Sequence, residues 1–209
     1  MIGIAPLALS FFLAGTARSA EISITNELTK SHMEAPGTAA YFVPADGMSP
    51  SGRFTGFVSE TRGIEFIVAN LKSPYKEISE AFTESTLKTR GLELGSRAEL
   101  TINGLDATLL KALHVDGDKK WGKWILLLDS GGSTIVANGM FTSGDGDAAR
   151  DIEAMIKSVV LKNGAPAVNA EAPATSPSDA DKGLDLALSS GSVVYTDEKM
   201  VNDDDDKDD

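Results

Sequence analysis

An α+β domain built on an antiparallel sheet is the fold class that the sequence predicts. Apolar runs, some of them alternating, indicate several strands between residues 54 and 142, and two other segments carry apolar residues at helical spacing. Tight turns join consecutive strands, and strands joined in this way run antiparallel. The chain has 209 residues, 42% of them apolar, which is enough for one such domain with appended segments.

The first expected elements are two strands, at residues 54–59 and 64–71. Ser73-Pro74 then indicates a helix start, because serine caps helix N-termini and proline fits the first helical turn. An apolar stripe runs from Ile78 to Leu87 at helical spacing, and Gly91 supplies a C-terminal stop. The sequence therefore predicts one helix after the first pair of strands.

Four further strands are expected in two hairpins. The first hairpin covers residues 92–115 around Asn103-Gly104, the dipeptide that type I′ turns prefer. The second covers residues 121–141, with a loop through Ser130–Ser133. A last helix is expected to start near Asp147, capped by that residue.

Both tryptophans of the chain lie in the third of these four strands. Trp121 and Trp124 differ by three positions, so a strand directs them to opposite faces of the sheet. Apolar residues follow on both faces, which predicts a central strand covered on both sides by helices, an α/β/α sandwich. Trp124 is expected in the core, and Trp121 at the rim of the sheet.

The chain resembles the PsbP/Mog-like fold group, and in particular its small exported bacterial members of unassigned function. The matching elements are the start at Phe42–Gly47, the hairpin turn at Asn103–Ala107 and the strand at Lys123-Trp124, within residues 40–161. This resemblance implies an antiparallel sheet with helices on both faces. It also implies non-catalytic binding or assembly, the role of known relatives in photosystem II or with a small GTPase. The metal-linked histidines of the photosystem relatives have no clear match here.

Residues 1–19 are predicted to be a cleaved signal peptide. An apolar run from Ile4 to Ala14 precedes Ala17-Arg18-Ser19, which fits the small-x-small rule for cleavage after Ser19, with Gly15-Thr16-Ala17 as an alternative. The run is too short to span a bilayer of about 30 Å. The mature protein is therefore expected to be periplasmic or secreted, without stable membrane insertion after signal cleavage.

The predicted domain covers residues 20–162, and three segments follow it. Residues 163–181 are expected to be an Ala/Pro-rich linker, residues 182–196 a short hairpin, and residues 197–209 a disordered tail with eight acids and two lysines. The whole chain has a net charge of −12, which disfavours nucleic acid and favours a basic envelope protein or peptide as partner. No prediction of oligomeric state is made.

Few residues are candidates for chemistry. The chain has no cysteine, which excludes thiolate catalysis and thiolate metal sites. The pair Asp145 and Asp147 fails the EF-hand template, and neither a metal nor a cofactor is expected. The candidate binding residues are Trp121, the neighbouring turn residues and the acidic tail, that is Trp121, Asp116, Asp118, Asp203, Asp204, Asp205 and Asp206.

The function predicted from these features is an exported, non-catalytic binding or assembly module of the cell envelope, with a flexible acidic C-terminal arm. One alternative is a periplasmic enzyme that uses carboxylates and His114, since carboxylates are plentiful. The other is a carrier of a small apolar ligand held between the sheet and a helix.

Overall fold

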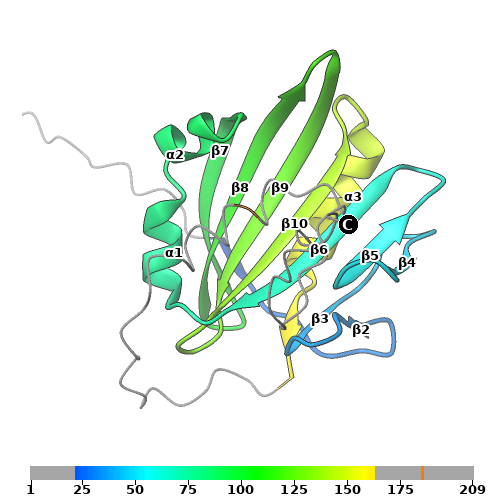
Figure 1. The fold of residues 1–209 in the computed structure, drawn as a ribbon. Helices are drawn as coiled ribbons and strands as arrows, with labels where there is room; N and C mark the ends of the chain where they lie inside the picture. The colour runs from blue at the N-terminus through cyan, green and yellow to red at the C-terminus, as the bar shows by residue number, and fades with distance from the viewer. Residues whose placement is uncertain (1–21, 163–184, 186–209) are drawn as a thin grey trace, which may run out of the picture.

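A sheet-dominated α+β domain is seen in the structure, a computed structural model that describes residues 22–162 and residue 185 (Figure 1). Its strands and helices, in chain order, are β1 Ile22–Ile24, β2 Met33–Glu34, β3 Ala40–Phe42, β4 Ser49–Pro50, β5 Gly56–Ser59, β6 Ile64–Leu71, α1 Tyr75–Ala81, α2 Glu84–Thr89, β7 Leu92–Ile102, β8 Leu105–Asp116, β9 Lys119–Asp129, β10 Thr134–Thr142, α3 Gly146–Lys157 and β11 Val160–Leu161. The α+β class predicted from the sequence is confirmed.

The main sheet has eight strands in the order β1-β7-β8-β9-β10-β6-β5-β4. Strands β7 to β10 form successive antiparallel hairpins, and β6 pairs with the far side of β10. The turn between β7 and β8 has positive φ at Asn103 (52°) and Gly104 (79°), as a type I′ turn requires. The predicted hairpins are therefore confirmed.

The prediction of a wholly antiparallel sheet is wrong at one edge. Strand β1 pairs with β7 in parallel, with Ile22 opposite Leu100 and Ile24 opposite Ile102. No tight turn joins these two strands along the chain, so the hairpin rule does not set their direction. A second, three-stranded sheet, β11-β3-β2, was also not predicted.

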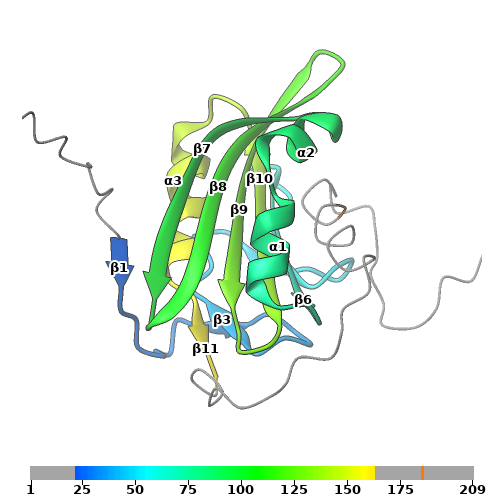
Figure 2. The same ribbon diagram turned by 90° about the vertical axis from the view of Figure 1, so that its left-hand side faces the viewer.

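Two hydrophobic clusters use alternate residues of the same strands. Ile125 and Leu127 of β9 join a cluster with side chains of α1 and α2, whereas Leu126 and Leu128 join a cluster with side chains of α3. Successive strand residues point to opposite faces, so the clusters lie on opposite sides of β9. We call the first side the α1 face. Figure 2 shows α1 and α3 against the sheet.

The expected single helix between Pro74 and Gly91 is two helices, α1 and α2. Thr83 interrupts it, because its hydroxyl accepts a hydrogen bond from Thr86 N at 3.1 Å and caps a new helix. Phe82 stays buried at the break. The cap of the last helix lies two residues earlier than predicted: Asp145, not Asp147, accepts hydrogen bonds from the backbone N–H groups of Asp147 and Ala148.

The outer segments of the chain were predicted but fall outside the described residues. These are the signal peptide, the linker, the acidic tail and the 182–196 hairpin, of which only Asp185 is described. Within residues 22–162, no helix is long and apolar enough to cross a membrane.

Candidate functional site

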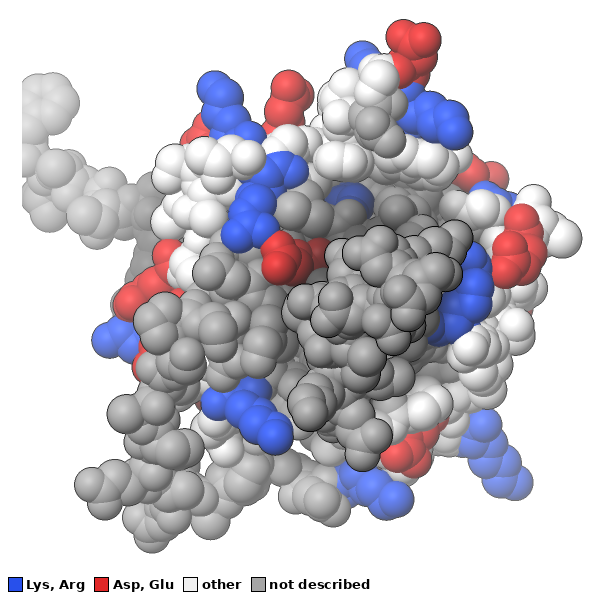
Figure 3. Space-filling view, in the orientation of Figure 1, with Lys and Arg blue, Asp and Glu red and all other residues white. Residues whose placement is uncertain are grey.

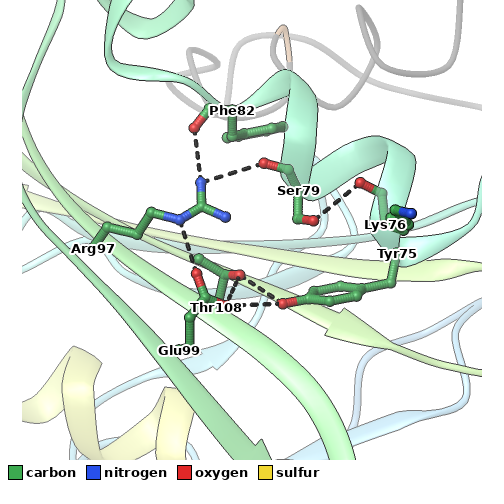
Figure 4. Close-up of polar contacts among 7 residues, drawn as sticks. All are labelled: Tyr75, Lys76, Ser79, Phe82, Arg97, Glu99 and Thr108. Carbon is green, nitrogen blue, oxygen red and sulfur yellow. Dashed lines mark hydrogen bonds and ion pairs between the residues drawn. The ribbon is translucent and has the colours of Figure 1, made fainter. Parts of the chain in front are cut away.

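A polar network ties α1 to the sheet (Figure 4). The Tyr75 hydroxyl lies 2.7 Å from Thr108 Oγ1, and Thr108 donates to Glu99 Oε2 at 2.8 Å. The Arg97 guanidinium donates to Glu99 Oε1 and also to the backbone carbonyls of Ser79 and Phe82, at the end of α1. Because these last carbonyls lack helical partners, Arg97 acts as a C-terminal cap supplied from the sheet.

Electrostatics in this network favour ionised Glu99. Burial alone would raise the Glu99 pKa, but hydrogen bonds from Thr108 and Arg97 outweigh it, and the pKa is lowered. Burial raises the pKa of Tyr75, so its hydroxyl stays protonated at neutral pH. Tyr75, Thr108, Glu99 and Arg97 are hydrogen-bonded to one another or to the α1 carbonyls, which is typical of structural bracing rather than of a reactive site.

Replacing Arg97 by Met should lower the free energy of unfolding by roughly 1–2 kcal/mol, because two α1 carbonyls and Glu99 lose a charged donor. Chemical denaturation measures this change. Arg150→Met is the control, since Arg150 makes only an exposed pair with Asp147 within its own helix and should change stability by less than about 0.5 kcal/mol. Equal effects of the two substitutions would contradict the bracing role.

A hollow of about 250 Å³ lies on the α1 face at one end of the main sheet. Its walls come from β5, β6, β9, β10 and the β5–β6 turn. The lining residues are Val58, Ser59, Glu60, Gly63, Ile64, Glu65, Trp121 and Met140. Trp121 reaches it from β9, where it is the direct partner of His114 on β8 and of Thr142 on β10. The hollow therefore combines an aromatic and aliphatic wall with two carboxylates.

Glu65 is the unusual polar group in this hollow. Its side chain is 13% exposed, and its Oε1 accepts a hydrogen bond from Arg53 at 3.4 Å. Within the described part of the chain, its Oε2 is a buried atom with no hydrogen-bond partner. Buried polar atoms are nearly always satisfied, so this oxygen is an acceptor available to a donor from outside the domain. Burial raises the Glu65 pKa, while Arg53 opposes this shift.

Lys123 lies in the same row of the sheet. Met140 on β10 is the partner of Glu65 on one side and of Lys123 on the other, so all three side chains share the α1 face. Lys123 is fully buried, and burial lowers its pKa to about 8, although Glu65 opposes the shift. The end of this face therefore holds a buried cation and a buried anion separated by one strand.

The candidate residues predicted from the sequence are only partly brought together. Trp121 lines the hollow, whereas Asp118, exposed in the β8–β9 turn, and Asp116, opposite Lys119 in the strand register at the end of β8, are not among its lining residues. The tail residues, Asp203 to Asp206, lie outside the described residues. Sequence reasoning missed Glu65, whose signal was a lone carboxylate inside the apolar strand that begins at Ile64.

Trp124 is directed away from the hollow, as its spacing predicts. It packs at the rim of the α3 cluster, half-buried rather than fully buried, with its ring edge-on to Phe141 at 5.6 Å. The Lys111 ammonium lies 4.0 Å from the centre of the ring, and Lys111 also pairs with Glu153 of α3. Trp124 was predicted to be a core residue, but Lys111 covers its indole ring at the edge of the cluster.

The two histidines are both tied to backbone carbonyls. His114 is half-buried with Nδ1 3.2 Å from the Gly91 oxygen, so this nitrogen carries the proton and donates it. His32 is half-buried, with Nε2 2.9 Å from the Ser158 oxygen and Nδ1 bonded to Thr29. Neither contact is the histidine–carboxylate arrangement of an acid–base pair.

Charge on the described domain is nearly balanced. Residues 22–162 carry 15 Lys and Arg and 18 Asp and Glu, a net charge of −3 against −12 for the whole chain. Figure 3 shows both signs interspersed over one face. In this part of the chain, no group of three or more metal-binding side chains is positioned to hold an ion. The surplus negative charge therefore belongs to the segments after residue 162.

These features define a small α+β domain with one aromatic and acidic hollow, a class suited to binding. No family model and no curated protein matches the chain. Solved structures do show partial similarity. The Saccharomyces cerevisiae Ran-binding protein Mog1p is 13% identical, with 65% of this chain and 97% of that chain covered and a TM-score of 0.45.

Two bacterial structures also show partial similarity. LpqN of Mycobacterium tuberculosis, involved in cell envelope biogenesis, is 13% identical, with 58% of this chain and 82% of that chain covered and a TM-score of 0.45. TplEi, a type VI secretion immunity protein of Pseudomonas aeruginosa, is 12% identical, with 62% and 52% covered and a TM-score of 0.40. At such values the similarity is partial and transfers neither partner nor activity to this chain.

Proposed function

We propose that this protein is a non-catalytic binding module of the cell envelope, with an α/β/α fold of the PsbP/Mog-like type, that recognises a basic protein or peptide. The hollow at Trp121 carries the proposal. It offers an aromatic contact of the kind that dominates binding energy in protein interfaces, beside a buried Glu65 oxygen, Oε2, that has no hydrogen-bond partner among the described residues. The acidic tail, residues 197–209, would supply the long-range attraction for a basic partner.

The two alternative functions have weaker support. The ring of His114 is oriented by the Gly91 carbonyl, a contact that supplies no acid–base partner. For a carrier of an apolar ligand, the space between helix and sheet would have to be open, yet Ile78, Phe82 and Leu87 are completely buried there. The hollow is also smaller than the 300–1,000 Å³ that is typical of small-molecule sites.

The test is retention of envelope proteins by the immobilised full chain. Trp121→Ala should reduce retention of the specific partner about tenfold or more, because an aromatic anchor is lost at a largely buried contact. Leu28→Ala is the matched control, since Leu28 is a 53% exposed apolar side chain outside the hollow. Equal retention by Trp121→Ala and the parent chain would contradict recognition at the hollow.

Neutralising the tail tests the second half of the proposal. Replacing Asp203, Asp204, Asp205 and Asp206 by Asn should weaken retention strongly at low salt and little at high salt, because salt screens exposed charges. Retention that is insensitive to both salt and these substitutions would contradict the role of the acidic tail.

A further inference from the structure

Two carboxylates and an arginine meet at the rim of the hollow. Arg53 Nη2 donates to Glu60 Oε1 at 3.2 Å and to Glu65 Oε1 at 3.4 Å. Both glutamates line the hollow, and the Glu60 side chain is 75% exposed, so this side of the hollow is open to solvent. The structure thus shows that these two carboxylates accept a guanidinium group from the surface.

The second oxygen of Glu65 lies deeper. The Glu65 side chain is 13% exposed, and its Oε2 is buried with no hydrogen-bond partner among the described residues. A buried acceptor without a donor is costly, so a donor that reaches this oxygen removes an unfavourable feature of the free protein. Because the acceptor belongs to a carboxylate, a cationic donor forms the stronger bond.

Trp121 adds an aromatic surface on the same side of the sheet. It stands two positions before Lys123 on β9, and Lys123 shares a row with Glu65 through Met140, so Trp121 and Glu65 are on one face. Both line the hollow together with Val58 and Met140. Guanidinium groups stack on indole rings, and the methylene stem of an arginine packs against apolar side chains. The lining therefore matches the two parts of an arginine side chain.

The charges around Glu65 are compatible with one more cation. After burial, which raises the Glu65 pKa, Arg53 has the largest effect on it, Glu60 the next and Lys123 the smallest. At Glu65, the nearby Lys123 charge therefore opposes an added cation less than Glu60 favours it. A guanidinium is more weakly hydrated than an ammonium and has five donors, so it suits a partly buried carboxylate better.

The size of the hollow indicates a side chain rather than a whole ligand. Its volume of about 250 Å³ is below the roughly 300–1,000 Å³ of small-molecule sites. A single long side chain, projecting from the surface of a partner, needs less space than a free molecule.

We infer that the hollow accepts one arginine side chain of the partner, whose guanidinium donates to Glu65 Oε2 and stacks on the ring of Trp121. This inference rests on the proposed function and names the group of a basic partner that the hollow recognises. Glu60 attracts the arginine at the rim, and Val58 and Met140 contact its methylene stem.

Titration of the ¹⁵N-labelled full chain with the blocked tripeptide acetyl-Gly-Arg-Gly-amide tests the inference. The indole N–H signal of Trp121 and the amide signals of residues 58–65 should shift, whereas the indole signal of Trp124, on the other face, should not. The same tripeptide with citrulline, a neutral isostere of arginine, should bind about tenfold more weakly, because the charge is lost. Equal binding of the two tripeptides, or shifts centred on Trp124, would overturn the inference.

A lysine tripeptide distinguishes arginine from cations in general. It should bind more weakly than the arginine tripeptide, because an ammonium is strongly hydrated and lacks the planar fork of donors. Equal binding of the lysine tripeptide would overturn the assignment of arginine.

Glu65→Gln tests the deep oxygen in the protein. It should weaken binding of the arginine tripeptide about tenfold, because the charged acceptor is lost. Glu93→Gln is the matched control, since Glu93 is exposed on β7 and is not among the lining residues, and it should bind as the parent does. A dispersed amide spectrum checks that each variant is folded, and unchanged binding by folded Glu65→Gln would contradict the inference.

Arg53→Gln gives a result that a purely structural role would not produce. It should tighten binding of the arginine tripeptide, because the carboxylates of the hollow lose the cation that competes for them. Arg62→Gln is the control, since Arg62 pairs with Asp151 of α3 and should leave binding unchanged. Binding that does not tighten in Arg53→Gln would count against a guanidinium site at these carboxylates.

Two outcomes separate this inference from the proposed function. If Trp121→Ala abolishes retention of the envelope partner but the arginine tripeptide does not bind, the inference is wrong and the proposed function stands. If the tripeptide binds as expected but Trp121→Ala retains the partner normally, the proposed function is wrong and the hollow remains an arginine-binding site.

Discussion

Gly56→Ala should strongly destabilise the protein. Gly56 begins β5 with a φ of 139°, a conformation that L-residues rarely adopt. A Cβ built there would lie 1.9 Å from the Phe66 carbonyl oxygen, 3.0 Å from the Phe66 carbonyl carbon and 3.1 Å from Ile67 Cα. These are backbone atoms of the neighbouring strand β6, so they cannot turn aside as a flexible side chain could.

The expected loss is more than roughly 3 kcal/mol in the free energy of unfolding, since backbone strain and overpacking each cost about 1–3 kcal/mol. Chemical denaturation measures it. Gly52→Ala is the control, because Gly52 has no neighbouring atom within 4 Å of the built Cβ and no positive φ. A Gly56→Ala protein within about 1 kcal/mol of its parent would contradict this account.

The same substitution links stability to the site. Strand β5 carries Val58 and Ser59 into the hollow, and it is held to β6 by the pairs from Gly56–Ile67 to Ser59–Ile64. If the strand is displaced, one wall of the hollow is displaced with it. Gly56 therefore positions the candidate site without lining it.

The predictable part of the fold was the part decided by local sequence. Asn103-Gly104 and the alternating strands on each side of it determine a hairpin within a few residues, so its turn and register follow from neighbours in the chain. The spacing of Trp121 and Trp124 is equally local, and it correctly separated them: Trp121 lines the hollow, and Trp124 packs against the cluster on the other face. Such features need no knowledge of distant contacts.

The features of the fold that the sequence did not predict depend on contacts between distant parts of the chain, or on a residue that can either cap a helix or continue it. Strand β1 has three residues and pairs with β7 about 78 positions away, which no periodicity within the strand reveals. The break between α1 and α2 depends on whether Thr83 caps a helix or continues one, and an apolar stripe through Phe82 is compatible with both. Short strands and helix breaks are therefore decided by tertiary packing.

In the candidate site, too, one residue could be predicted from local sequence and another depended on a distant contact. Trp121 could be singled out because an aromatic residue beside a turn is visible in the sequence. Glu65 could not be joined to it, since the two lie 56 positions apart and meet only when β10 inserts between β6 and β9. A carboxylate in an apolar strand is nevertheless a readable signal, because burial of an acid is costly unless something in the protein or a ligand compensates it.

Replacing Lys123 by Met should maintain or raise stability at neutral pH. The Lys123 side chain is fully buried, and the cost of burying its charge lowers its pKa to about 8. Methionine has a similar length and carries no charge, and exchange of a buried ion for an apolar group is often neutral or stabilising by about 1–4 kcal/mol. Lys120→Met is the control, since Lys120 is exposed on the same strand and should have little effect.

The sharper expectation for Lys123 concerns pH. In the unfolded chain its pKa is near 10.5, so between pH 8 and 10.5 the unfolded state binds more protons than the folded state. The stability of the parent protein should therefore rise with pH in this window relative to Lys123→Met, which has no such group. The difference between the pKa of 10.5 in the unfolded chain and about 8 in the folded protein corresponds to at most about 3 kcal/mol in the free energy of unfolding.

Denaturation curves of both proteins between pH 7 and 10.5 measure whether the stability of the parent protein approaches that of Lys123→Met as the pH rises. Because other lysines and tyrosines titrate equally in both, the difference between the two proteins isolates Lys123. A constant difference across the window would mean that folding does not lower the Lys123 pKa, which would contradict this expectation. A convergence of the expected size would establish that this end of the α1 face excludes water, the condition under which the Glu65 oxygen and Trp121 can contribute strongly to binding.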